Sequence, residues 1–118
     1  MPLRKLVERL TRPVEDHDRD KLIEFCDARA GCAHIDDLEP RSLARVVGEV
    51  SSVRVVPRAG APSLEVTVTD GRGNLVAVFF GRRHLAGLHP GRRLVVEGVV
   101  AESGNRALVF NPVYELLA

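Results

Sequence analysis

Two glycines around an arginine, Gly71-Arg72-Gly73, could form a loop that binds phosphate through backbone N–H groups. Such a loop needs a helix directly after the glycines, because the N–H groups at the helix start face the phosphate. Residues 74–80 instead read NLVAVFF, a β-branched and aromatic run that predicts a strand. Residues 64–69 alternate apolar and polar, which also predicts a strand. Asp70-Gly71 is a hairpin signal, so we predict a turn between two strands rather than a nucleotide-binding loop.

Other residue types in the chain could bind zinc or carry out catalysis. Cys26, Cys32, His34 and Asp36 could bind zinc, but their spacing matches no common zinc-knuckle pattern, and Cys26 falls on the apolar side of a predicted helix. The four histidines form no evident set with a nucleophile, and no paired-carboxylate motif stands out. We therefore predict no metal, no cofactor, no small-molecule substrate and no enzymatic activity.

Length and composition indicate one globular domain. The chain has 118 residues, of which 45% are hydrophobic and 28% charged. No apolar run approaches the ~18 residues that a membrane span needs, and no signal-peptide core begins the chain, so we expect a cytoplasmic protein without membrane association. Two cysteines predict no disulfide framework.

The net charge of +1 hides an uneven distribution. Residues 1–13 carry +3, residues 14–39 carry −6 and residues 40–118 carry +4. Fifteen of the seventeen cations are arginine, the side chain best suited to phosphate contacts and base stacking.

The N-terminal third has helical patterns, and the rest of the chain has strand patterns. Apolar residues at helical spacing predict a short basic helix before Pro13 and a second helix that ends near Ala30. We expect residues 1–42 to form a helical and acidic extension and residues 43–118 to form a separate domain. Residues 1–34 could bind a protein partner.

From Leu43 onward we predict five strands, with one short helix between the third and the fourth. The strands are expected at 44–56, 64–69, 75–80, 92–100 and 106–110, and the helix at 82–88. Gly48 and Gly98 each interrupt an apolar strand, as the bends of a small barrel require. The pattern predicts a mainly β protein, an OB-fold Greek-key barrel preceded by N-terminal helices. A five-stranded SH3-like barrel is the competing fold, and the helix before the fourth strand argues against it.

Several short motifs occur in an order that is typical of one group of OB-folds. They are Ile35-x-Asp37-Leu38-x-Pro40, Val46-x-Gly48-x-Val50, Leu64-Glu65-Val66, Asp70-Gly71-x-Gly73, Phe79-Phe80, Pro90-Gly91-x-x-Leu94, Gly98-x-Val100 and Asn111-Pro112-x-Tyr114-Glu115. With them, residues 35–118 resemble the wedge domain of the RecG branch-migration helicase and, more closely, small stand-alone bacterial OB-fold nucleic acid binding domain proteins. The resemblance implies binding of single-stranded or branched DNA without helicase activity. It places His84 where the wedge commonly has a stacking aromatic, and an imidazole stacks more weakly.

The ligand face of an OB-fold is the outer side of its second and third strands, with the loops beside them. Alternation places Leu64, Val66 and Val68 inside, so Glu65, Thr67 and Thr69 face outward. The same count turns Leu75, Ala77 and Phe79 inward and Val76, Val78 and Phe80 outward. Phe80 could stack on a base, or it could cover the end of the barrel.

Arginines gather in the loops around this face, and Arg82 and Arg83 would begin the short helix. We predict a nucleic-acid-binding module that is not an enzyme. Its expected contact residues are Arg54, Arg58, Thr67, Thr69, Arg72, Phe80, Arg82, Arg83, His84 and Arg106. The alternative is a protein-interaction OB-fold without intrinsic nucleic-acid binding, which Glu65 and the few aromatic residues of the face favour.

Overall fold

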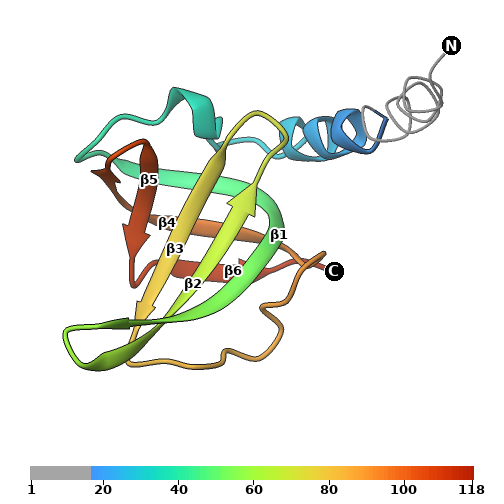
Figure 1. The fold of residues 1–118 in the computed structure, drawn as a ribbon. Helices are drawn as coiled ribbons and strands as arrows, with labels where there is room; N and C mark the ends of the chain where they lie inside the picture. The colour runs from blue at the N-terminus through green and yellow to red at the C-terminus, as the bar shows by residue number, and fades with distance from the viewer. Residues whose placement is uncertain (1–16) are drawn as a thin grey trace, which may run out of the picture.

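The computed structural model describes residues 17–118, and the predicted first helix lies outside this range (Figure 1). Residues 17–27 form a helix, which ends slightly before the predicted Ala30. The remaining elements are the 3-10 turn η1 (Ile35–Asp37) and the strands β1 (Leu43–Arg58), β2 (Ala61–Thr69), β3 (Asn74–Phe80), β4 (Arg93–Ser103), β5 (Arg106–Phe110) and β6 (Val113–Leu116). The prediction of a mainly β protein is therefore confirmed. No helix in the described range is long and apolar enough to cross a membrane.

Five strands close into a ring. The hydrogen-bonded order is β1-β2-β3-β5-β4, and β4 returns to pair with β1. All these pairings are antiparallel except the one between β3 and β5. This arrangement agrees with the OB-fold expected from the sequence.

The sixth strand continues β5 rather than adding a new member to the ring. Val100 pairs with Val109 on β5, and Leu94 pairs with Leu116 on β6. Leu94 and Val100 of β4 are six positions apart, whereas their partners Val109 and Leu116 are seven positions apart. One extra residue therefore enters at Asn111-Pro112, where the sequence had predicted the strand to end, and this irregularity is a β-bulge.

The two predicted glycine bends lie where β1 and β4 change partners. Gly48 is close to the point where β1 leaves β4 for β2, and a Cβ at Gly48 would lie 2.6 Å from the backbone oxygen of Thr69. Gly98 lies just before the point where β4 leaves β1 for β5, and its Cβ would lie 3.3 Å from Pro112. Both positions therefore allow close approach, as the sequence predicted.

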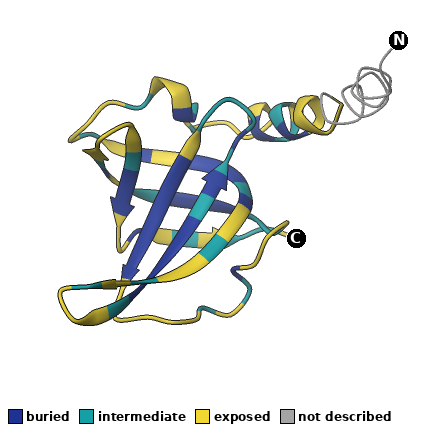
Figure 2. Cartoon of the chain, in the orientation of Figure 1, coloured by how far each residue is buried: buried dark blue, intermediate teal, exposed yellow. Residues whose placement is uncertain are grey.

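The core fills the ring with the side chains that alternation had turned inward. Leu64, Val66 and Val68 of β2 and Leu75, Ala77 and Phe79 of β3 are all buried in it. Figure 2 shows this buried surface on the strands, whereas much of the projecting end of the β1–β2 hairpin is exposed. Ile35 of η1 also packs into this core, so the segment before β1 is attached to the ring.

The predicted helix at 82–88 is wrong. Residues 81–92 run from β3 to β4 as an irregular segment, and Leu88 donates a single turn-like hydrogen bond to the oxygen of Leu85 at 3.2 Å. Gly87 has a φ of 83°, a left-handed conformation that a right-handed helix cannot contain. The apolar spacing arises because Leu85 and Leu88 pack against the ring core from this irregular segment.

The helix at 17–27 packs on the outer side of β1 and β4. Leu22 and Cys26 are buried against Val47 and Val95. In Figure 1 the helix lies beside the turn between β2 and β3, far from the tip of the β1–β2 hairpin. The two ends of β2 thus have different surroundings. The predicted contact residues are therefore divided between two separate regions.

Candidate nucleic-acid interface

The outer face of β2, β3 and β5 is built from rows of directly paired residues. One row joins Arg54 of β1, Glu65 of β2, Val78 of β3 and Phe110 of β5. Because strand pairing sets these neighbours, residues that are distant in sequence become adjacent on one surface. Ser63 and Phe80 are paired nearer to the hairpin tip.

Glu65 is the centre of this face and accepts hydrogen bonds from three arginines. The Nη2 atoms of Arg54, Arg58 and Arg106 donate to its carboxylate at 3.2, 3.0 and 2.9 Å. The Glu65 side chain is 3% exposed, whereas those of Arg54 and Arg106 are 65% and 45% exposed. The outer edges of these guanidinium groups are therefore open to a ligand, although the carboxylate is not.

The three arginines keep Glu65 ionised. Burial by itself would raise the pKa of Glu65, but the hydrogen bonds from Arg58, Arg54 and Arg106 outweigh it and leave the pKa below the usual 4.5. At neutral pH the cluster of three guanidinium groups and one carboxylate therefore carries a net positive charge.

Two aromatic rings lie next to this cluster. Phe80 and Phe110 are stacked, with their centroids 5.4 Å apart and their planes 8° from parallel. Both are exposed, at 47% and 41%, and the guanidinium carbon of Arg58 lies 6.0 Å from the centre of the Phe110 ring. Phe80 is therefore not buried in the core, and an exposed pair of rings beside arginines can accept a stacked base.

Asn111 holds the two rings in place at the bulge. Its backbone N–H donates to the oxygen of Val78 at 2.7 Å, and its side-chain Oδ1 accepts from the N–H of Phe80 at 2.9 Å. These two bonds extend the β3–β5 pairing to the ends of the strands that carry Phe80 and Phe110.

The next predicted contacts, Arg82, Arg83 and His84, follow Phe80 directly. All three are exposed, and no described residue forms an ion pair with any of them. They do not begin a helix, so no helix N-terminus assists them. Their position at the same end of β3 as the rings still lets them extend a basic surface along the chain.

Arg72 and Thr69 lie at the opposite end of β2, by the helix at 17–27. Arg72 donates twice to Asp27, at 2.8 and 3.0 Å. The hydrogen bond from Arg72 lowers the pKa of Asp27, and the same bond raises the pKa of Arg72. Thr69 lines a hollow between the helix and the β2–β3 turn, and its hydroxyl accepts from Gly71 at 3.2 Å. The structure therefore separates these two residues from the other expected contacts.

Thr67 lies between these two regions, next to buried side chains of the outer face. It pairs with Val76, which pairs with Leu108. Val76, Val78 and Leu108 form a small buried cluster on this face. This apolar cluster forms the buried part of the face, next to the arginines.

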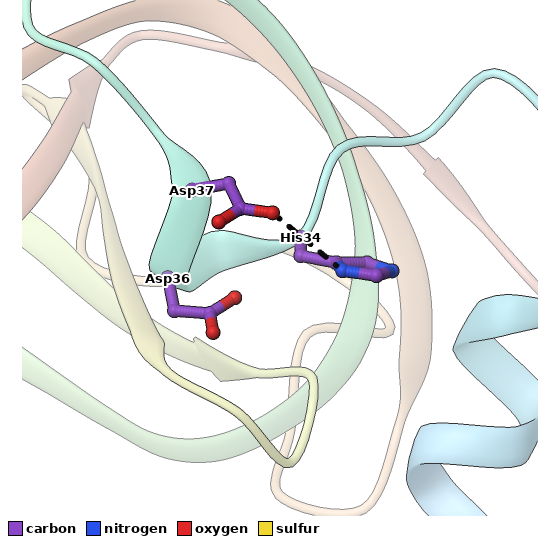
Figure 3. Close-up of side chains that lie close together, drawn as sticks. All are labelled: His34, Asp36 and Asp37. Carbon is purple, nitrogen blue, oxygen red and sulfur yellow. Dashed lines mark ion pairs between the residues drawn. The ribbon is translucent and has the colours of Figure 1, made fainter.

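Of the four residues considered for zinc, His34 and Asp36 come together, but Cys26 and Cys32 do not join them. Among residues 17–118, the side chains that could share a metal ion are His34, Asp36 and Asp37, and neither cysteine joins them (Figure 3). His34 already lies 3.2 Å from Asp27 and 3.8 Å from Asp37. Burial, with the nearby charge of Asp70 next in size, raises the pKa of the Cys26 thiol to about 11. We assign no metal site to these residues.

Sequence reasoning missed Phe110, Asn111 and the central role of Glu65. Alternation along residues 106–110 could have turned Phe110 outward together with Arg106. The pairing of β3 with β5 brings Phe110 to Phe80, and no local sequence signal predicts that pairing. From the sequence alone, Glu65 only favours the protein-interaction alternative.

A family model matches most of the described chain. The model of a family described as OB-fold nucleic acid binding domain, which carries the name tRNA anti-codon, matches residues 44–118. No curated protein matches the chain.

Proposed function

Because the chain belongs to the OB-fold nucleic acid binding domain family, we propose that it is a non-enzymatic module that binds single-stranded or branched DNA. The observation that carries this proposal is the exposed Phe80–Phe110 stack beside the arginines of the β2–β3–β5 face. Residues 43–118 would form the binding module, and residues 1–42 would be its extension.

The proposed contacts divide by chemistry. Phe80 and Phe110 would stack on bases, which is worth ~1–3 kcal/mol per base and tolerates any sequence. The outer edges of Arg54, Arg58 and Arg106, together with the loop residues Arg82, Arg83 and His84, would contact phosphates. Thr67 would lie beneath the bound nucleic-acid strand. Thr69 and Arg72 have no part in the proposed contacts.

A preference for single strands follows from this arrangement. The rings can stack only on bases that are not already stacked in a duplex, whereas the arginines can bind the phosphates of either form. The resemblance to the helicase wedge supports junction DNA as a ligand. RNA single strands offer the same two groups, and the name of the family model makes RNA a necessary comparison in the test.

The test is a salt titration with labelled single-stranded DNA and RNA oligonucleotides and with a DNA junction. The wild-type protein should bind single-stranded DNA with an affinity that falls as salt rises, because phosphate contacts release counterions. Replacing Arg82 and Arg83 together by alanine should flatten the slope of log K against log[salt] by about 1.4, because each contact on a single strand contributes about 0.7. An unchanged slope and affinity would remove this loop from the interface.

The matched variant is Phe80→Ala, which should lose ~1–3 kcal/mol of binding with little change of slope, because stacking releases few ions. Thermal unfolding of each variant would show that the ring remains folded. Absence of binding to any of the three nucleic acids at low salt would reject the proposed function.

The second candidate is a protein-interaction module, and an exposed apolar group favours it. Leu43, Val99 and Val113 are 69%, 59% and 75% exposed. Leu43 pairs with Val99, and Val113 pairs with Glu97 two residues away. They lie together on the outer side of β1, β4 and β6, beyond the part that the helix at 17–27 covers.

A further inference from the structure

The carboxylate of Glu65 occupies the point where three arginines of the proposed interface converge. Two of them come from the β1–β2 hairpin and one from β5. Glu65 itself is on β2 and is almost completely buried, whereas its partners remain partly exposed. A single acidic group therefore connects the three positive side chains of this face.

A nucleic-acid phosphate would seek the same donors. Carboxylate and phosphate oxygens both accept from guanidinium N–H groups in planar, charge-assisted hydrogen bonds. Each of the three arginines already gives one terminal nitrogen to Glu65. The Nε atom of Arg58 has no hydrogen-bond partner among the described residues, but it is buried and is therefore not open to a phosphate.

The charge balance at the cluster decides how strongly a bare phosphate chain is attracted. Glu65 cancels one of the three positive charges, and the arginines that it holds are less able to turn toward other anions. The rings of Phe80 and Phe110 remain exposed beside the cluster. Glu65 therefore weakens the attraction of phosphates and leaves base stacking as the larger contribution to binding.

We propose that Glu65 is a specificity-determining residue of the nucleic-acid face: it competes with phosphates for Arg54, Arg58 and Arg106, and so makes binding depend on stacked bases. This inference rests on the proposed function. It predicts that the face discriminates against duplex DNA, which offers phosphates without accessible base faces.

The variant Glu65→Gln tests the proposal, because glutamine keeps the shape and loses the charge. It should bind a single-stranded oligonucleotide about 3- to 10-fold more tightly at low salt, as the loss of one repulsive charge near the phosphates implies. Its salt slope should steepen by about 0.7 for one additional phosphate contact on a single strand. The gain should be larger for a sequence-matched duplex, where each contact contributes about 0.9.

Glu97→Gln is the matched control. Glu97 also pairs with an arginine, Arg45, at 3.2 Å, but on the outer side of β1 and β4. The substitution makes the same change of net charge and should alter affinity less than 2-fold, because the site is remote and screened. Equal tightening by both variants would overturn the proposal, as would unchanged or weaker binding by Glu65→Gln.

Circular dichroism and thermal unfolding would show whether Glu65→Gln folds. If it does not, a second pair of variants tests the proposal. Arg54→Ala removes a highly exposed arginine that Glu65 holds, and Arg82→Ala removes one for which no described residue is an ion-pair partner. Arg54→Ala should flatten the salt slope by less than half as much as Arg82→Ala. Equal flattening would overturn the proposal. If no variant and no wild-type protein binds nucleic acid, the proposed function fails and this inference fails with it.

Discussion

At the scale of single residues, Glu65 shows how burial and pairing set the charge of a group. Its pKa lies below 4.5 although the side chain is buried, because three arginines donate to the ionised form. A carboxyl group whose pKa is lower in the folded state stabilises the fold above the pKa of the unfolded chain. The stabilisation disappears as the pH falls through the folded pKa.

The lowered pKa of Glu65 gives a prediction about the stability of the fold. At pH 7 the Glu65→Gln variant should be less stable than the wild type by about 1.5–3 kcal/mol, the cost of losing hydrogen bonds to a charged group. The difference should shrink as the pH falls from the unfolded-chain pKa of 4.5 through the lower folded pKa, because the unfolded chain takes up its proton before the folded protein does. Urea unfolding at pH values from 7 to 3 measures it. A difference that stays constant over this range would show that the charge of Glu65 contributes nothing to stability.

At the scale of elements, the helix at 17–27 is attached to the ring by two kinds of contact. Leu22 and Cys26 are buried against Val47 and Val95, and Asp27 pairs with Arg72. The ion pair is solvent-exposed, so it contributes little to stability. Truncation of a buried leucine to alanine costs about 2 kcal/mol or more. Apolar packing should therefore dominate the attachment.

Thiol labelling of Cys26 tests this ranking. The thiol is buried and its pKa is raised to about 11, so labelling requires the helix to detach. With Cys32 replaced by serine, Leu22→Ala should accelerate labelling roughly 30-fold, as a loss of about 2 kcal/mol implies. Asp27→Asn should accelerate it less than about 5-fold, because a solvent-exposed ion pair contributes little to stability.

Lys21→Ala is the control, because Lys21 is exposed on the same helix and its loss should leave the labelling rate unchanged. An Asp27→Asn effect as large as that of Leu22→Ala would show that the ion pair, rather than apolar packing, holds the helix.

The elements also show what a sequence can reveal and what it cannot. Alternation along β2 and β3 assigned the inward residues correctly, because a half-buried strand has a period of two. The glycines at 48 and 98 marked the two partner changes because a residue without a side chain allows close approach there. The expected helix at 82–88 failed because Leu85 and Leu88 bury themselves against the ring without any helical periodicity in the backbone.

The candidate site was harder to predict than the fold, because its contacts join distant parts of the chain. Glu65 meets Arg106 across 41 positions, and Phe80 meets Phe110 through the parallel pairing of β3 with β5. Arg72 was expected at the ligand face because it lies on the turn between β2 and β3. The structure instead pairs it with Asp27 of the helix at 17–27. Composition and local spacing carry no information on such pairings.

At the scale of the whole molecule, the ring has two outer faces of different character. The β2–β3–β5 face carries the three arginines around Glu65 and the Phe80–Phe110 stack. The β1–β4–β6 face carries the helix at 17–27 over Val47 and Val95, and beyond it the exposed Leu43, Val99 and Val113. The two candidate functions would therefore use different faces.

Nuclear magnetic resonance can locate the ligand on the intact chain. Titration with a single-stranded oligonucleotide should shift the amide signals of Glu65, Phe80, Phe110 and the 81–84 segment, since stacked bases and nearby phosphates change the surroundings of these backbone groups. Signals of Leu43, Val99 and Val113 should remain in place, because the exposed aromatic rings of residues 17–118, Phe80 and Phe110, lie on the other face. The Glu65→Gln variant should show the same pattern at lower oligonucleotide concentration. Shifts confined to Leu43, Val99 and Val113 would place the ligand on the apolar face and would reject the interface built here around Glu65.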